Sequence, residues 1–181
     1  MKATVAAVMM SAVLAGPGLA SDKPYAGQEG REIASLSEAD VAALLAGEGW
    51  GLALPAELNG FPGPAHVLEL AAELALSDAQ VAEVQAVFDA MQAEAQRLGA
   101  EYVAAEKHLS MMFRLGHASA EMLEAQLTAS SDALAALRLV HLRAHLEVTP
   151  MLTEAQRETY AQLRGYGGDG AHSGHDGHTG H

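Results

Sequence analysis

The sequence of 181 residues contains no cysteine and few basic residues. The absence of cysteine excludes disulfides, thiolate metal sites and cysteine nucleophiles. Ten lysines and arginines stand against 23 aspartates and glutamates, which gives a formal net charge of -13 at pH 7. Such an excess of negative charge repels nucleic acid and favours cations. The composition therefore argues against a nucleic-acid partner.

Short catalytic motifs are also missing. The sequence has no glycine-rich phosphate loop, no nucleophile elbow and no HExxH motif. Its carboxylates are spread at three- and four-residue spacings along expected helix faces, where water solvates them. We therefore do not expect the protein to be an enzyme.

A single apolar stretch, "ATVAAVMMSAVLA", follows Lys2 and leads into "GPGLAS". The stretch is shorter than the roughly 20 residues that cross a bilayer. Gly18 and Ala20 are the small residues that a signal peptidase needs near its cut, so residues 1–20 are typical of a cleaved secretory signal. A retained anchor is the alternative. We expect the remaining chain to act in the periplasm.

Residues 21–63 are rich in glycine and proline and predict an irregular segment with one short helix. That helix is "SEADVAALLAG", with Ser37 as its N-cap. The apolar residues expected to pack this segment onto the rest of the protein are Trp50, Leu52, Leu54 and Phe61.

From Ser77 onward, apolar residues recur in steps of three and four, which predicts two long amphipathic helices. The first stripe is Val81, Val84, Phe88, Met91, Ala95, Leu98, Tyr102, Ala105, Leu109 and Met112. The second is Leu123, Leu127, Ser130, Leu134, Leu137, His141, Ala144 and Val148. Gly116 would end the first helix and Ser119 would cap the second, so we expect an antiparallel hairpin. Since little else covers the two stripes, we also expect a homodimer.

A short motif occurs twice, as "LSDAQ" at residues 76–80 and "LTEAQ" at residues 152–156. Each copy places Ser77 or Thr153 at an N-cap, with Gln80 or Gln156 three residues later, which is a capping box. The second copy opens a final short helix, "TEAQRETYAQLRGY". Taken alone, two capping boxes prove only two helix starts.

With the apolar leader and the long hairpin between its copies, this motif pair resembles the "LTxxQ" pair of the Spy/CpxP-type periplasmic proteins. That group includes zinc-resistance-associated and nickel/cobalt-sensing proteins. The resemblance covers residues 64–164 and implies an all-α, cradle-like dimer that acts in envelope stress or metal response. It also implies two kinds of partner, unfolded envelope proteins or a membrane-bound signalling protein.

His141 and His145 lie four residues apart in "LVHLRAHLEV", so both project from one helix face and could bind one metal ion. Glu147 or a histidine of a dimer partner could complete the site. A histidine on an apolar stripe is alternatively a hydrogen-bonded core residue. Near the first long helix, His108 with Met111 and Met112 could suit copper, although methionines at helical spacing are usually core residues.

The segment also resembles a helix of the nickel/cobalt sensors in which "LVH" precedes a second ligand, a methionine, by four residues. The resemblance implies metal ligands at His141 and His145. The family's remaining ligands come from a histidine pair in the helix before the first motif. Here His66 matches one of them, and Leu70 occupies the place of the other.

The chain ends in "AHSGHDGHTGH", with His172, His175, His178 and His181 at every third position. Glycine-rich spacers form no packed core, so residues 165–181 should be disordered and the four imidazoles able to converge on one zinc, copper or nickel ion. The alternatives are a solvated tail or an engineered tag. The sequence favours a metal-binding stress protein, with an ATP-independent chaperone as the second hypothesis.

Overall fold

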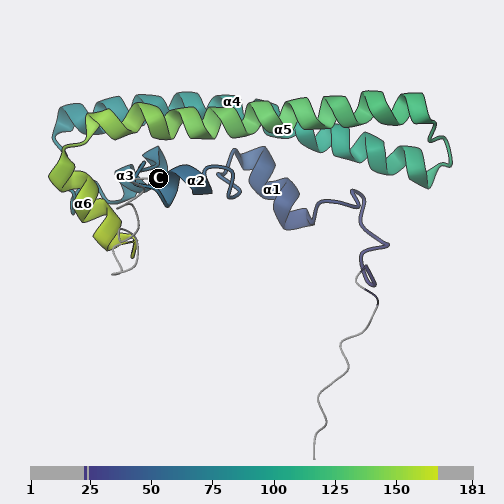
Figure 1. Ribbon diagram of the computed structural model, residues 1–181, viewed down its shortest axis with the longest axis horizontal. Helices are drawn as coiled ribbons and strands as arrows, with labels where there is room; N and C mark the ends of the chain where they lie inside the picture. The colour runs from purple at the N-terminus through teal and green to yellow at the C-terminus, as the bar shows by residue number, and fades with distance from the viewer. Residues whose placement is uncertain (1–22, 24, 167–181) are drawn as a thin grey trace, which may run out of the picture. The chain divides into compact units, whose positions relative to one another are not determined.

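The computed structural model describes Lys23 and residues 25–166, and every regular element in this part of the chain is helical (Figure 1). The α-helices are α1 (Glu38–Ala46), α2 (Leu54–Glu57), α3 (Pro64–Glu69), α4 (Asp78–Arg114), α5 (Ala120–Val148) and α6 (Glu154–Leu163), and a 3-10 turn (Thr149–Met151) joins α5 to α6. The predicted all-α class and the pair of long helices are confirmed. In this same part of the chain, no helix has the length and apolar character needed to span a membrane.

The chain divides at Gly30 into two units. In the first unit, the described residues form turns, with backbone hydrogen bonds from Ala26 to Lys23 and from Gln28 to Tyr25. The helices named above all belong to the second unit, Arg31–His181. The expected signal at residues 1–20 and the four tail histidines lie outside the described residues.

The two long helices lie side by side and are joined by a short turn (Figure 1). The caps predicted for them form, because Ser77 accepts a hydrogen bond from the N–H of Gln80 and Ser119 accepts one from the N–H of Met122. Just after α4, Gly116 takes a φ of 69°, in the left-handed region that glycine enters at little cost. Local sequence signals therefore account for the turn.

Hydrogen bonds near the two ends of the pair establish its register. Gln126 Nε2 donates to the carbonyl oxygen of Ala105 at 2.8 Å, and Gln80 Nε2 donates to that of Met151 at 2.8 Å. The two helices therefore run in opposite directions. Leu127, which the sequence pattern placed on the core stripe, is exposed, because Gln126 takes the buried position beside it.

The two capping boxes are joined to each other. Each glutamine side chain accepts a hydrogen bond from the backbone N–H of its own cap residue, Ser77 or Thr153. In addition, Gln80 Nε2 donates to Gln156 Oε1 at 2.9 Å, and Gln156 Nε2 donates to Gln80 Oε1 at 3.3 Å. The repeated motif therefore ties the start of α6 to the start of α4, beyond starting two helices.

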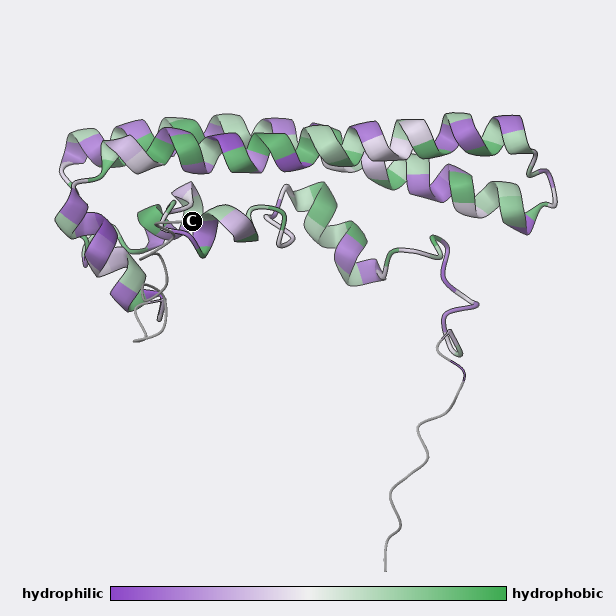
Figure 2. Ribbon diagram, viewed as in Figure 1, coloured by the Kyte–Doolittle hydropathy of each residue, from purple (hydrophilic) through white to green (hydrophobic). Residues whose placement is uncertain are grey.

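Apolar side chains form two buried clusters, and hydrophobic and hydrophilic residues alternate around both long helices (Figure 2). The first cluster joins residues 33–44 to α4 and α5 through Ile33, Leu36, Leu44, Ala95, Leu98, Tyr102, Ala133 and Leu137. The second lies where α3 and α6 meet the long helices and contains Val67, Leu74, Val84, Val148, Leu152 and Tyr160. These clusters anchor the short helices onto the long pair.

Helix α1 meets α4 in direct backbone contact. A Cβ built on Gly99 would lie 2.2 Å from the carbonyl oxygen of Leu44, a distance that no real side chain could keep. Gly99 lies within α4, where glycine is unfavourable to the helix by itself. The close approach of α1 therefore explains its presence.

The packing of residues 21–63 differs in part from the prediction. Trp50 and Leu52 lie partly buried against the first cluster, as expected. Leu54 and Phe61 are exposed instead. At Phe61 the backbone faces α5, because its carbonyl oxygen lies 2.7 Å from His145 Nδ1, and this contact leaves the Phe61 side chain pointing outward.

Residues 31–37, which we call the strap, are held against α4 by polar contacts. Arg114 of α4 donates to two backbone carbonyl groups of the strap. Deeper in, Glu106 is 8% exposed and accepts hydrogen bonds from the hydroxyls of Ser35 and Ser130, one on each carboxylate oxygen. The strap, α4 and α5 therefore meet at a buried carboxylate with both oxygens satisfied.

Candidate functional site

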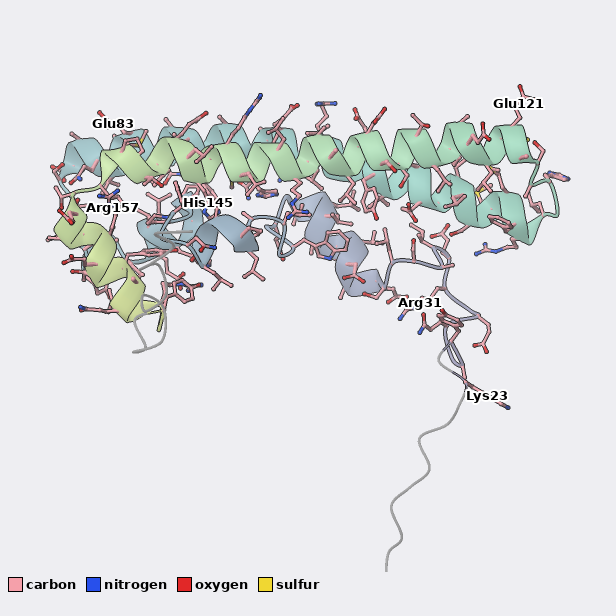
Figure 3. All side chains as sticks on the ribbon, viewed as in Figure 1. Lys23, Arg31, Glu83, Glu121, His145 and Arg157 are labelled. Atoms are coloured by element: carbon pink, nitrogen blue, oxygen red, sulfur yellow. The ribbon has the colours of Figure 1, made fainter. Side chains whose placement is uncertain are left out.

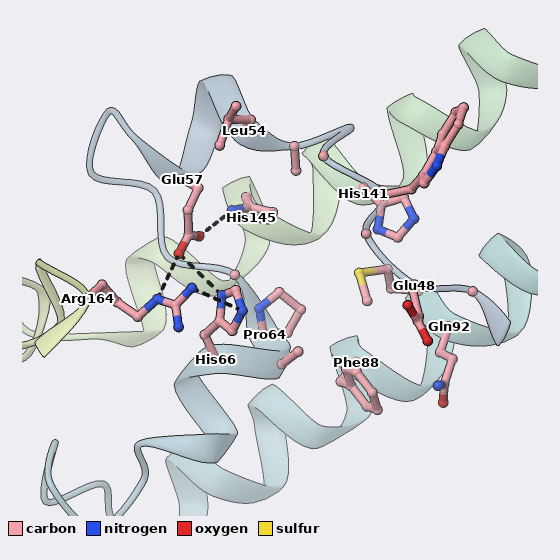
Figure 4. Close-up of a pocket in the computed structure, with 18 of the residues that line it drawn as sticks. Glu48, Leu54, Glu57, Pro64, His66, Phe88, Gln92, His141, His145 and Arg164 are labelled. Carbon is pink, nitrogen blue, oxygen red and sulfur yellow. Dashed lines mark hydrogen bonds and ion pairs between the residues drawn. The ribbon is translucent and has the colours of Figure 1, made fainter. Parts of the chain in front are cut away.

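A pocket of about 530 Å³ lies between the loop after α1, helix α3 and the two long helices. Its lining is largely apolar and includes Trp50, Leu54, Phe88 and Met91. Polar side chains reach it from α2 (Glu57), α3 (His66), α5 (His141 and His145) and the residue after α6 (Arg164) (Figure 4). Glu48, Gln92 and Tyr166 also line it. An apolar pocket with a few convergent polar groups is the usual form of a ligand site.

Glu57 is the centre of the polar side of this pocket and is only 7% exposed. The hydroxyls of Tyr160 and Tyr166 donate to its Oε1, the latter at 3.1 Å, and Arg164 Nε lies 3.6 Å from the same oxygen. Burial, followed by the contact with Glu57, raises the pKa of Tyr160 far above its usual value, so this hydroxyl remains a donor. Among the described residues, Glu57 Oε2 has no hydrogen-bond partner.

His66 joins the Glu57 group from α3. Its Nδ1 lies 3.3 Å from Glu57 Oε1, and its Nε2 lies 3.3 Å from Arg164 Nη2 (Figure 4). Each ring nitrogen of His66 therefore has a polar neighbour, Glu57 for Nδ1 and Arg164 for Nε2. Leu70, four residues after His66, packs against the second apolar cluster.

His145 points from α5 toward the short helices (Figure 3). Its Nδ1 lies 2.7 Å from the carbonyl oxygen of Phe61, which can only accept, so in the neutral ring Nδ1 carries the proton and Nε2 the lone pair. Glu57 Oε2 lies 3.7 Å from the same Nδ1. A Cβ at Gly63 would lie 2.9 Å from Nε2, so the glycine leaves room at the lone pair.

His141 lies one helical turn before His145 and is 2% exposed. Its Nε2 is buried without a hydrogen-bond partner among the described residues. Burial, and secondly the neighbouring His145, lower the pKa of His141, so its ring is neutral at pH 7. A neutral imidazole is the form that binds metals.

The three histidines predicted in this part of the chain all line the pocket, but they lie in two groups. His66 and His145 contact Glu57, whereas His141 occupies the side of the pocket near Glu48 and Gln92 (Figure 4). Within residues 23 and 25–166, no three side chains of the His, Cys, Asp and Glu types converge as a metal cluster.

Sequence reasoning missed Glu57, Tyr160, Arg164 and Tyr166. Glu57 lies far along the chain from His145, and "LPAELNG" carries no local sign that its carboxylate is buried. The nearer carboxylate considered for the site, Glu147, is exposed. Only tertiary packing brings α2 and the end of α6 to α5.

The copper hypothesis at the far end of α4 finds little geometric support. Met112 is buried in the interior, whereas His108 and Met111 are exposed. Their opposite environments indicate a core methionine beside solvated neighbours.

Comparisons of the chain with protein-family models, with curated protein sequences and with solved structures gave no match.

Proposed function

We propose that the chain is a periplasmic, non-enzymatic metal-binding stress protein of the Spy/CpxP type. Its ligands in the helical part are the Nε2 atoms of His141 and His145, and its tail histidines supply a second site. The observation that carries the proposal is the buried Nε2 of His141, which lacks a partner among the described residues, in a residue that lines the same pocket as His145.

An unsatisfied buried polar atom costs about 1–3 kcal/mol, so a native protein that keeps one usually has a reason, such as a bound ion. Here the atom belongs to a ring that is neutral at pH 7, with a second imidazole four residues away on the same helix face. A metal ion bound to His141 Nε2 would remove the cost. The geometry therefore supports a metal ligand better than a hydrogen-bonded core histidine.

Glu57 and His66 form the surroundings of this site. The protonated Nδ1 of His145 donates to the carbonyl oxygen of Phe61, a contact of the kind that orients a metal-binding imidazole, and Glu57 Oε2 lies 3.7 Å from the same nitrogen. His66 lies on the other side of Glu57 and contacts Arg164, so we assign it to the supporting group.

Calorimetric titration of zinc, nickel and copper tests the proposal at neutral pH. We expect a full-length variant with Asn at positions 172, 175, 178 and 181 to retain one equivalent of tight binding, and His141→Ala in that background to lose it. His117→Ala, at an exposed histidine in the turn after α4, is the matched control and should bind normally. Absence of binding in the tail variant would refute the ordered site. Absence of binding in both the unmodified chain and the tail variant would refute metal binding altogether.

A second candidate, an ATP-independent chaperone, is favoured by apolar side chains at the turn between α4 and α5. Phe113 is 60% and Leu115 is 58% exposed, and such a patch can hold unfolded chains. Suppression of the aggregation of a reduced, unfolded client measures this activity by light scattering. Replacing both residues with serine should abolish suppression, and unchanged suppression would refute this surface. If the same variant converts a dimer to a monomer, the patch belongs to a homodimer interface instead.

A further inference from the structure

The pocket supplies an unusual set of donors for a metal ion held by His141 and His145. In the part of the chain that the structure describes, no three His, Cys, Asp or Glu side chains form a group that could hold a metal ion. Zinc and nickel normally require at least four donors, most of them nitrogen or oxygen. The two histidines alone therefore form a poor site for either ion.

The pocket also contains a thioether, because Met91 of α4 belongs to its lining. Gln80 faces Met151 at one end of the helix pair, and Ala105 faces Gln126 toward the other. This register sets Met91 across from the turn of α5 that carries the two histidines.

We propose that the pocket binds copper as Cu(I), through Nε2 of His141, Nε2 of His145 and the sulfur of Met91. The inference rests on the proposed metal-binding function and specifies its metal. Thioether sulfur is a soft ligand that selects Cu(I), and Cu(I) accepts low coordination numbers. Met91 has three rotatable side-chain bonds with which to bring its sulfur to the ion.

Charge favours the same ion. The lining as a whole is largely apolar, and burying an ion in such surroundings costs more as its charge rises. Of the two carboxylates in the lining, Glu48 is exposed to solvent, and the buried one, Glu57, already lies beside Arg164. A single positive charge is therefore accommodated more easily than the double charge of zinc or nickel.

Sequence spacing alone did not indicate Met91 as a metal ligand, because it placed this residue on the apolar stripe of the first long helix. The stripe histidine and the stripe methionine become a common site only because α4 and α5 pack in this register. The site also differs from His108, Met111 and Met112, where the side chains have opposite exposures.

Competition against a chromophoric Cu(I) chelator, under anaerobic reducing conditions, measures the Cu(I) affinity of the full-length tail variant, which carries His172→Asn, His175→Asn, His178→Asn and His181→Asn. We expect one equivalent of Cu(I), bound at least about 100-fold more tightly than zinc or nickel in parallel titrations. Met91→Leu should weaken Cu(I) binding by about tenfold or more and leave zinc unchanged. Met111→Leu, at an exposed methionine, should leave both unchanged.

X-ray absorption at the copper edge provides a readout that needs no variant. A copper–sulfur shell in the tail variant supports the inference, and a spectrum with only nitrogen or oxygen neighbours overturns it. Zinc or nickel binding as tight as Cu(I), or an unchanged Cu(I) affinity in Met91→Leu, also overturns it while the proposed metal-binding function stands. If none of the three ions binds, the proposed function itself fails.

Discussion

Two carboxylates in the described part of the chain are buried to nearly the same degree, but they have very different surroundings. Glu106, between the strap and the long helices, has a serine hydroxyl on each oxygen. Glu57 has several donors crowded onto Oε1, no hydrogen-bond partner for Oε2 within the described residues, and a pocket beside it. A buried polar group whose bonds are complete holds a fold together, whereas one left incomplete beside a cavity marks a place where something can bind.

The largest effect should come from Gly99, on the structural side of this comparison. In Gly99→Ala the new Cβ would meet the backbone of Leu44, which cannot move without lifting α1 from α4. We expect a loss of about 3 kcal/mol or more in the free energy of unfolding, measured by urea denaturation. Gly116→Ala is the control, since it has open space and only an unfavourable φ, and should cost about 1 kcal/mol. Equal losses in the two variants would contradict the close contact.

Replacing the two carboxylates with isosteric amides tests the comparison directly. Glu57→Gln removes the charge that faces Arg164 and His66, and we expect it to cost about 2 kcal/mol of stability and to weaken metal binding about tenfold. Glu106→Gln keeps an acceptor for rotating serine hydroxyls, so we expect a cost of about 1 kcal/mol and unchanged metal affinity. Calorimetry and urea denaturation of both variants provide the measurements. A metal affinity that falls equally in both would mean that Glu57 has no special role.

The sequence predicted those features that are determined by neighbouring residues. Ser77, Ser119 and Thr153 cap helices because the bonds they make reach only three residues ahead. The joining of Gln80 to Gln156 needs two distant helix starts to meet, and no local spacing encodes that. The same limit applies to Gly99, which as a local signal only weakens a helix.

For the candidate site too, the sequence predicted what depends on neighbouring residues but not what depends on tertiary packing. The spacing of His141 and His145 placed both on one helix face, but it could not say what would face them. Glu57 reaches His145 only after α2 folds back onto α5. Exposure was equally hidden, since nothing in the local pattern distinguished buried Glu57 from exposed Glu147.

At Gly63, beside the pocket, a substitution should cost less stability than Gly99→Ala but should weaken metal binding. A Cβ there would lie 2.8 Å from Cε1 and 2.9 Å from Nε2 of His145, so Gly63→Ala should push the ring aside. Because a side chain can give way where the backbone at Gly99 cannot, we expect only about 1 kcal/mol of destabilisation. Metal affinity should nevertheless fall about tenfold, since the alanine occupies the space at the lone pair. Calorimetry should show this loss, and full affinity in a folded Gly63→Ala protein would place the ligand atom elsewhere.

The smallest effect should be a dependence of stability on pH that originates at His141. Because burial lowers its pKa in the native protein, the unfolded chain takes up this proton more readily. The stability that neutral His141 contributes is complete above about pH 6.5 and is lost as the pH falls below that value. In metal-free protein, urea denaturation at pH 7 and pH 5 should therefore show a smaller loss of stability for His141→Leu than for the unmodified chain. His117→Leu, at an exposed site, should keep the full loss, and equal losses in all three proteins would mean that His141 is not held neutral by its surroundings.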